Sequence, residues 1–222
     1  MSLILAVETT TKNCSVALFE NEILICFKEQ NSSNYIHSES LIIFIQDVMS
    51  QAKKNMIDLD CVAVSKGPGS FTGLRIGTST AKGLCYSLDI PLIAVSTLQN
   101  MALTVSKIKK YKYFCPMIDA RRMEVYSSLY DQFNNEVREI RADVVDENTY
   151  SEFLTDKVLF FGDGAMKCKE IINNKNACFY DGVFPSAKEM GELINYKYAN
   201  KYFEDIAYYE PYYLKDFVSG KK

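Results

Sequence analysis

The chain contains, at residues 67–77, the sequence Gly67-Pro68-Gly69-Ser70-Phe71-Thr72-Gly73-Leu74-Arg75-Ile76-Gly77. The apolar segment 61–65 before it predicts a buried strand. After it, apolar residues recur at helical spacing, at Leu74, Ala81, Leu84, Cys85 and Leu88. We therefore expect a glycine-rich turn between a strand and a helix, with Ser70 or Thr72 accepting a hydrogen bond from the first free N–H groups of the helix.

A glycine turn before a helix can bind phosphate, because free N–H groups and the positive end of the helix dipole point outward together. The spacing here matches neither common template: Thr72 replaces the third glycine of the dinucleotide fingerprint, and no Gly-Lys-Ser/Thr follows as a P-loop requires. A structural turn is favoured, and a phosphate role stays open. Gly73, Gly77 and Ala81 recur every four residues and predict a flat ridge that another helix, of this chain or of a partner, could approach closely.

The 222 residues fit one large domain or two small ones, with enough chain for a sizeable core. The net charge of -3 argues against a free-standing nucleic-acid binder, although a local basic patch stays open. No apolar run approaches the roughly 18 residues of a membrane span, and the chain enters a strand pattern without a basic leader. These features predict a cytoplasmic protein without a membrane segment.

The seven cysteines are an odd number, scattered through apolar segments without a CxxC pair, which is typical of buried reduced thiols. His37 is the only histidine, so sites that need two histidines are excluded and no metal site is expected. At the start of a predicted helix, a lone histidine is more often a cap or an interface residue than a base or a ligand.

The first hundred residues predict a mixed α/β sheet. Apolar strand patterns occur at residues 3–7, 14–19, 23–27, 61–65 and 91–95, and helices are expected at about 37–52 and from Thr72 onward. The first helix has apolar residues on more than one stripe, which predicts burial on two sides, one against the sheet and one against the next helix or a partner. They are Leu41, Ile42, Phe44, Ile45, Val48 and Met49.

The second half partly repeats this pattern. A strand at 113–118 ends at Asp119 as the first strand ends at Glu8, and further strands are expected at 124–130, 136–145, 158–161 and 178–180, with a helix at about 165–173. We infer two related lobes, 1–103 and 104–222. A last helix from Ser186, capped with Glu189, and an aromatic tail at 208–215 are expected to pack back on the first lobe.

Residues 104–112 include Lys107, Lys109, Lys110 and Lys112 and are expected to form a surface linker. Tyr111 and Tyr113 interleave these lysines, so a nucleic-acid contact is the alternative interpretation.

Two such lobes are the plan of the actin-like ATPases, in which acidic strand ends and glycine turns close on a nucleotide. On that analogy, Glu8, Thr9, Thr10, Asp119 and Arg121 are candidate nucleotide or anion contacts. The simpler interpretation is that Glu8 and Asp119 cap turns after their strands. Arg121 and Arg122 lie on a turn that could hold an anion or a partner's carboxylate, or be solvated.

Several segments together strongly resemble the TsaB (YeaZ) family. They are residues 4–10 and 14–18, His37-Ser38-Glu39, residues 67–77, Lys82-Gly83-Leu84, Asp119-Ala120-Arg121, Glu124-Val125-Tyr126 and Pro211-Tyr212-Tyr213-Leu214. The resemblance is densest over residues 3–103. It implies a cytoplasmic bacterial protein of the actin-like ATPase superfamily, with a ribonuclease H-like sheet in each lobe.

The resemblance further implies a non-catalytic partner of TsaD, which transfers threonylcarbamoyl to an adenosine beside the tRNA anticodon. It implies contact with TsaE through the complex, with tRNA indirectly, and a homodimer when the chain is alone. No tightly bound cofactor is implied, and ATP and magnesium are expected only within the complex. TsaD's metal ligands include an HxxxH pair that this chain lacks, so a glycoprotease label would be inherited from the paralogue.

In that family the first-lobe helices form the partner contact. The resemblance therefore implies an interface at His37, Glu39, Leu41, Ile45, Thr72, Gly73, Ile76, Gly77, Thr80 and Ala81. Glu8 stands where many members have aspartate, which argues against a phosphate or magnesium role there. The alternative function is a stand-alone ATP-using enzyme of the same superfamily.

Overall fold

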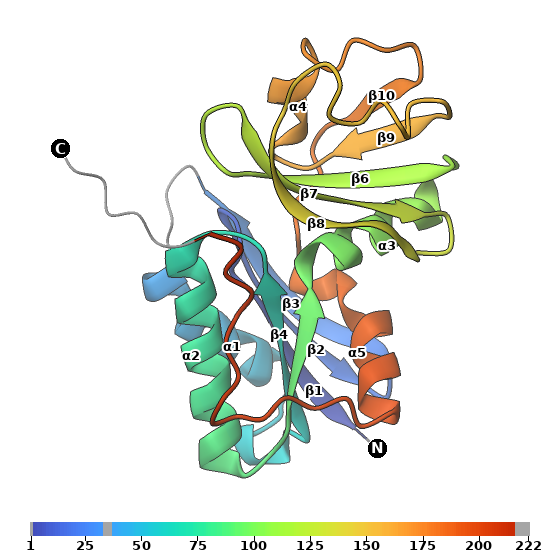
Figure 1. Ribbon diagram of the computed structural model, residues 1–222. Coiled ribbons are helices and arrows are strands. Elements are labelled where there is room, and N and C mark those ends of the chain that lie inside the picture. The colour runs from blue at the N-terminus through green and yellow to red at the C-terminus, as the bar shows by residue number, and fades with distance from the viewer. Residues whose placement is uncertain (1, 33–36, 216–222) are drawn as a thin grey trace, which may run out of the picture. The chain divides into compact units, whose positions relative to one another are not determined.

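The computed structural model describes residues 2–32 and 37–215, which fall into two compact units (Figure 1). Unit 1 comprises residues 1–100 and 185–211, and unit 2 comprises residues 101–184 and 212–222. The segment 185–211 therefore belongs to unit 1, whereas the sequence-based division placed it in the second lobe.

Unit 1 is built on a five-stranded sheet of order β3-β2-β1-β4-β5. Its strands are β1 (Leu3–Glu8), β2 (Asn13–Glu20), β3 (Ile23–Asn31), β4 (Cys61–Gly67) and β5 (Leu92–Ser96). β1, β4 and β5 run parallel, and β2 is antiparallel to both of its neighbours. The carboxyl ends of the three parallel strands therefore lie along one edge of the sheet, which we call the carboxyl edge.

Helices cover both faces of this sheet (Figure 1). On one face α1 (His37–Gln51) and α2 (Phe71–Leu88) pack against residues such as Leu5 and Val62, and a 3-10 turn, η1 (Met56–Asp58), follows α1. On the other face η2 (Ala187–Glu189) and α5 (Gly191–Ala199) pack against Ile4 and Ile93. The alternating side chains of each strand fill these two cores, as expected of a sheet buried on both sides.

Unit 2 repeats the sheet in the order β10-β9-β6-β7-β8. Its elements are β6 (Tyr113–Asp119), β7 (Glu124–Asp131), β8 (Glu136–Val144), β9 (Val158–Phe161), α4 (Ala165–Cys168) and β10 (Ala177–Tyr180). β6, β9 and β10 are parallel and β7 is antiparallel, so β6 corresponds to β1 and β9 to β4. The predicted fold is confirmed. Each unit contains one mixed sheet of the same strand order with flanking helices, which is the ribonuclease H-like plan of the actin-like ATPases.

The core of unit 2 encloses an ion pair. Arg138 donates to both oxygens of Asp143 at 2.8 and 2.6 Å, and Ser127 Oγ donates to Asp143 Oδ2 at 2.5 Å. The Tyr150 hydroxyl lies 2.9 Å from Ser127 Oγ and donates to Asp143. Burial acts against charge on Asp143, but these bonds outweigh it and lower the pKa of the carboxyl.

Three sequence-based expectations need correction. Residues 97–108 form helix α3 (Thr97–Ile108), so the predicted linker at 104–112 is helical through Ile108, because Met101, Ala102 and Val105 are buried. Ser186 does not cap a helix, since its hydroxyl donates to Glu29 Oε2 at 2.7 Å. The helix expected at 165–173 ends at Cys168.

Candidate functional site

The carboxyl edge of unit 1 is occupied by the turn that follows β1. Glu8, the last residue of β1, is fully buried, and its Oε1 accepts hydrogen bonds from the Thr10 N–H at 2.6 Å and the Thr10 hydroxyl at 2.5 Å. Burial raises the pKa of Glu8 to about 7, although the bonds from Thr10 oppose this shift. Among the described residues no lysine or arginine pairs with this carboxyl, so no cation offsets the effect of burial on its pKa.

The glycine-rich loop packs directly on this turn. A Cβ added to Gly69 would lie 2.3 Å from the Thr10 carbonyl oxygen, and one added to Gly73 would lie 2.0 Å from the Thr9 carbonyl oxygen. The Ser70 N–H donates to Thr10 O at 2.7 Å, and Ser70 Oγ caps α2 by accepting from the Gly73 N–H. These N–H groups are already used within the chain, which favours the structural turn over a phosphate loop.

The small residues of α2 face inward. Thr9 donates its hydroxyl proton to Gly73 O at 2.8 Å, and a Cβ on Gly77 would lie 2.3 Å from Thr9 Oγ1. The ridge of Gly73, Gly77 and Ala81 is therefore covered by unit 1 itself and is not open to a partner helix. A Gly77→Arg change would therefore disrupt the packing of α2 on Thr9 rather than probe a partner surface.

His37 lies inside unit 1 at the start of α1. Its Nε2 lies 2.7 Å from Thr11 O, and the imidazole is almost fully buried. Burial lowers the pKa of His37, and the contact with the Thr11 carbonyl opposes that shift. The histidine thus ties α1 to the turn after β1. Within residues 2–32 and 37–215, no three His, Cys, Asp or Glu side chains cluster closely enough to hold a metal ion.

The acidic residue at the corresponding edge of unit 2 is exposed. Asp119 ends β6 with 47% of its side chain exposed, and its Oδ1 accepts from the Arg121 N–H at 2.8 Å and from Lys167 Nζ at 2.5 Å. Arg121 and Arg122 are exposed and have positive φ angles of 70° and 46°, as in a tight turn. Glu8 and Asp119 belong to different units, so a nucleotide contact by both remains a prediction.

The candidate interface residues fall into two groups. Glu39 and Thr72 are exposed and Ile76 and Thr80 are half-buried, so these four are accessible on the outer surface of unit 1. The others are buried within the unit: His37, Leu41, Ile45, Gly73, Gly77 and Ala81. Only the first group is available for direct contact with a partner.

The structure adds apolar residues to this outer surface. Ile43 of α1 is 53% exposed beside the similarly exposed Ile42, and Tyr86 of α2 is 85% exposed. Ile42 belongs to the apolar set that exceeded one helical stripe, so the sequence did carry a signal for it. On α2 the exposed positions recur at helical spacing, and Gly83 has open space around it. The exposed positions of α2 at this spacing are Thr72, Arg75, Ser79, Gly83 and Tyr86.

Because α1 and α2 contact each other on one face of the sheet, their exposed sides form one surface, which we call the α1–α2 face. Exposed isoleucine and tyrosine side chains on such a surface are typical of a face that another protein covers.

Comparisons with known proteins point to one family. A family model described as TsaD, tRNA N6-adenosine threonylcarbamoyltransferase, matches residues 31–209. The "tRNA threonylcarbamoyladenosine biosynthesis protein TsaB" of Escherichia coli (strain K12) is 28% identical, over 99% of this chain and 97% of that protein. The protein of the same name from Bacillus subtilis (strain 168) is 32% identical, over 77% of this chain and 75% of its own length.

Solved structures agree on the fold. YeaZ from Pseudomonas aeruginosa superimposes with a TM-score of 0.80 over 96% of this chain and all of that chain, at 24% identity. The matching family model and the curated relatives confirm the resemblance inferred from the sequence motifs, and the relatives' names connect the family with tRNA threonylcarbamoyladenosine biosynthesis. The chain belongs to the TsaB (YeaZ) family, within the broader group that the TsaD model describes.

Proposed function

We propose that this protein is a non-catalytic subunit that binds and supports a TsaD-type transferase during transfer of threonylcarbamoyl to adenosine beside the tRNA anticodon. The observation that carries the proposal is the exposed α1–α2 face, with Ile42, Ile43 and Tyr86 at its surface. Next to it, the carboxyl edge of unit 1 is filled by the chain's own groups. An apolar outer surface beside a closed polar edge suits binding of a partner better than chemistry.

The partner we propose is the TsaD paralogue. Small residues at Ser79 and Gly83 let a facing helix approach closely, while the isoleucines supply apolar area. Paralogues share their sheet order, so the same face can pair with TsaD or, when the chain is alone, with a second copy. Contact with the TsaE ATPase, and the placement of tRNA at the transferase, would then follow through the complex.

ATP and magnesium would bind only within that complex. The N–H groups of Thr10 and Ser70 already have acceptors inside the chain, and the Glu8 carboxyl is buried and partly protonated. We therefore propose no tightly bound cofactor in the isolated chain. No helix in the described part of the chain is long and apolar enough to span a bilayer, and we propose the cytoplasm as its location.

A stand-alone ATP-using enzyme is the second candidate. It is favoured by one observation, the acidic residues Glu8 and Asp119 at equivalent strand ends of the two sheets. This alternative requires magnesium-dependent ATP turnover by the purified chain that disappears in Asp119→Asn.

Light scattering on a sizing column tests the subunit proposal, with the chain alone and mixed with the TsaD paralogue of the same organism. We expect a mixed complex that replaces a self-dimer. Ile43→Glu should weaken the mixed complex because it would bury a charge in the interface. Gly83→Arg should weaken it because the long side chain would hold the facing helix away. Val144→Glu, at an exposed position of unit 2, is the matched control and should leave the complex intact. If the two proteins stay separate with and without nucleotide, the subunit proposal fails.

A further inference from the structure

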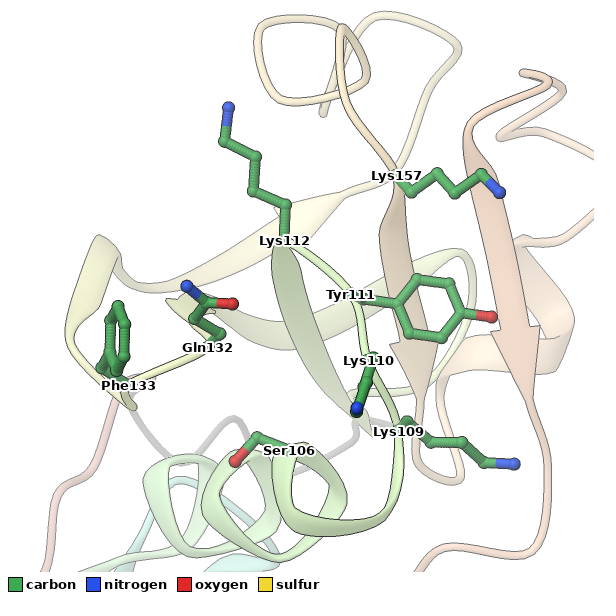
Figure 2. A pocket seen from close by; sticks show the side chains of 8 residues that line it. All are labelled: Ser106, Lys109, Lys110, Tyr111, Lys112, Gln132, Phe133 and Lys157. Atoms are coloured by element: carbon green, nitrogen blue, oxygen red, sulfur yellow. The ribbon is translucent and has the colours of Figure 1, made fainter.

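The edge of unit 2 opposite to Asp119 carries a basic groove with a volume of about 600 Å³ (Figure 2). It lies where β6 and β9 begin and where β7 turns into β8, next to the end of α3. The described residues that line it include no acidic residue and four lysines, Lys109, Lys110, Lys112 and Lys157. Asp156 offsets one of these charges through an ion pair with Lys112, so the groove is positive although the whole chain is acidic.

The lysines are spread along the groove. Figure 2 shows the side chains of Lys112 and Lys157 pointing in different directions, with Lys110 below both of them. Lys109 also lines the groove, and its Nζ lies 4.4 Å from the centre of the Tyr180 ring in a cation–π contact. Amino groups that diverge in this way cannot meet on one phosphate, so they suit a polyanion whose charges are spaced along a backbone.

Two aromatic rings accompany these charges. Phe133 is 75% exposed at the tip of the β7–β8 turn. That turn is rigid, because Asp131 accepts hydrogen bonds from the Phe133 N–H at 2.8 Å and the Asn135 N–H at 2.9 Å. Tyr111 lines the same groove. An exposed phenylalanine on a hydrogen-bonded turn offers a flat surface on which an unpaired base can stack.

We propose that this groove binds an unpaired segment of RNA, with the lysines on its phosphates and Phe133 on a base. The choice of RNA rests on the proposed function in tRNA modification. An acidic polypeptide would be attracted by the same lysines but would gain nothing from a ring that stacks on bases, so we favour RNA.

Fluorescence anisotropy with a labelled, unmodified tRNA transcript and the full chain tests this. We expect binding that weakens with salt. Lys110→Glu/Lys157→Glu should reduce the affinity by on the order of tenfold. It should also lower the slope of log affinity against log salt by about 1.5, because each of the two lost phosphate contacts contributes roughly 0.7–0.9 to that slope. Lys53→Glu/Lys169→Glu, which changes two exposed lysines outside the groove, is the charge-matched control and should change the affinity less than twofold.

Phe133→Ala separates stacking from charge. It should weaken binding by on the order of tenfold, the usual effect of one lost stacking platform, and leave the salt slope unchanged. Poly-glutamate of equal charge should compete poorly. The proposal is overturned if no binding occurs at about 100 µM chain in low salt, if the control double variant weakens binding as much as the groove variant, or if poly-glutamate competes as well as tRNA. Each of these outcomes can occur whether or not the chain forms a complex with TsaD.

Discussion

The two units have the same strand order, but the acidic residue that ends the first strand is buried in unit 1 and exposed in unit 2. In unit 1, Glu8 is fully buried, accepts hydrogen bonds from Thr10 of the following turn and has a pKa raised by burial to about 7. In unit 2, Asp119 is exposed and paired with Lys167. Unit 2 does bury a carboxylate, Asp143, but it supplies the cation Arg138.

This difference separates fold from function. The shared sheet places an acidic residue at the end of the first strand, and only the surroundings decide whether it can meet a ligand. In unit 1 the glycine-rich loop covers the turn, and a clash with the Thr10 and Thr9 carbonyls is avoided only because Gly69 and Gly73 lack side chains. The glycine-rich loop, one of the segments that resemble the TsaB family, thus closes the carboxyl edge of unit 1 and positions α2. The outer side of α2 forms part of the proposed partner surface.

The largest effect is expected from breaking the buried pair in unit 2. Asp143→Ala should lower the free energy of unfolding by about 3–5 kcal/mol, because Arg138 would remain buried without its partner. Urea unfolding measures the loss. Arg138→Met/Asp143→Leu should recover much of it, and a loss below about 1 kcal/mol in Asp143→Ala would show that the pair is not a constraint on the core.

Glu8→Gln tests the buried carboxyl of unit 1. The unfolded chain releases this proton near pH 4.5 and the folded chain near pH 7, so the folded state binds more protons in that window and loses stability as the pH rises through it. The contribution is on the order of 3 kcal/mol at most. The variant lacks it, so its stability relative to wild type should rise between pH 5 and pH 8. Parallel pH profiles in urea unfolding would contradict the raised pKa.

Gly73→Ala tests the contact between the glycine loop and the turn. The added methyl would press on the Thr9 carbonyl, and overpacking of this kind costs about 1–3 kcal/mol. Gly83→Ala is the matched control in the same helix: its methyl would meet open space, and we expect a gain of roughly 0.5–1 kcal/mol from helix propensity. Thermal unfolding of both variants gives the comparison. Equal shifts would mean that α2 does not pack on the turn as described.

Asp119→Asn should have the smallest effect on stability. The pair with Lys167 is exposed, and such pairs contribute about 0–1 kcal/mol. The asparagine oxygen can still accept the Arg121 N–H. A loss above about 2 kcal/mol in chemical denaturation would place Asp119 among the structural residues and remove the contrast between the two edges.

The sequence predicted the duplicated sheets because apolar periodicity and turn residues are local signals. The strand-end positions of Glu8 and Asp119 followed from the same pattern. The sequence led us to expect that the helix after Ser186 packs back on the first lobe, but not which contacts hold segment 185–211 there. These contacts are long-range, such as Asn13 Nδ2 donating to Pro185 O and the Ala187 N–H donating to Ser15 Oγ.

The sequence also could not show whether the small-residue ridge of α2 faces the protein interior or the solvent. Four-residue spacing shows that Gly73 and Gly77 share one side of a helix, but not that Thr9 covers that side. Helix α3 was not predicted at all, because its lysine-rich end was interpreted as a surface linker although Met101 and Val105 are buried. Side-chain burial depends on packing between distant segments, and no local pattern reports it.

The most direct measurement is threonylcarbamoyl transfer to tRNA in a reconstituted reaction, with and without this chain, with the TsaD paralogue and the other components held constant. The account predicts no product from the chain without TsaD, product from TsaD when wild-type chain is added, and a large loss with Ile43→Glu but not with Val144→Glu. Product formed by this chain without TsaD, or equal product from TsaD in its absence, would contradict the role of a non-catalytic supporting subunit.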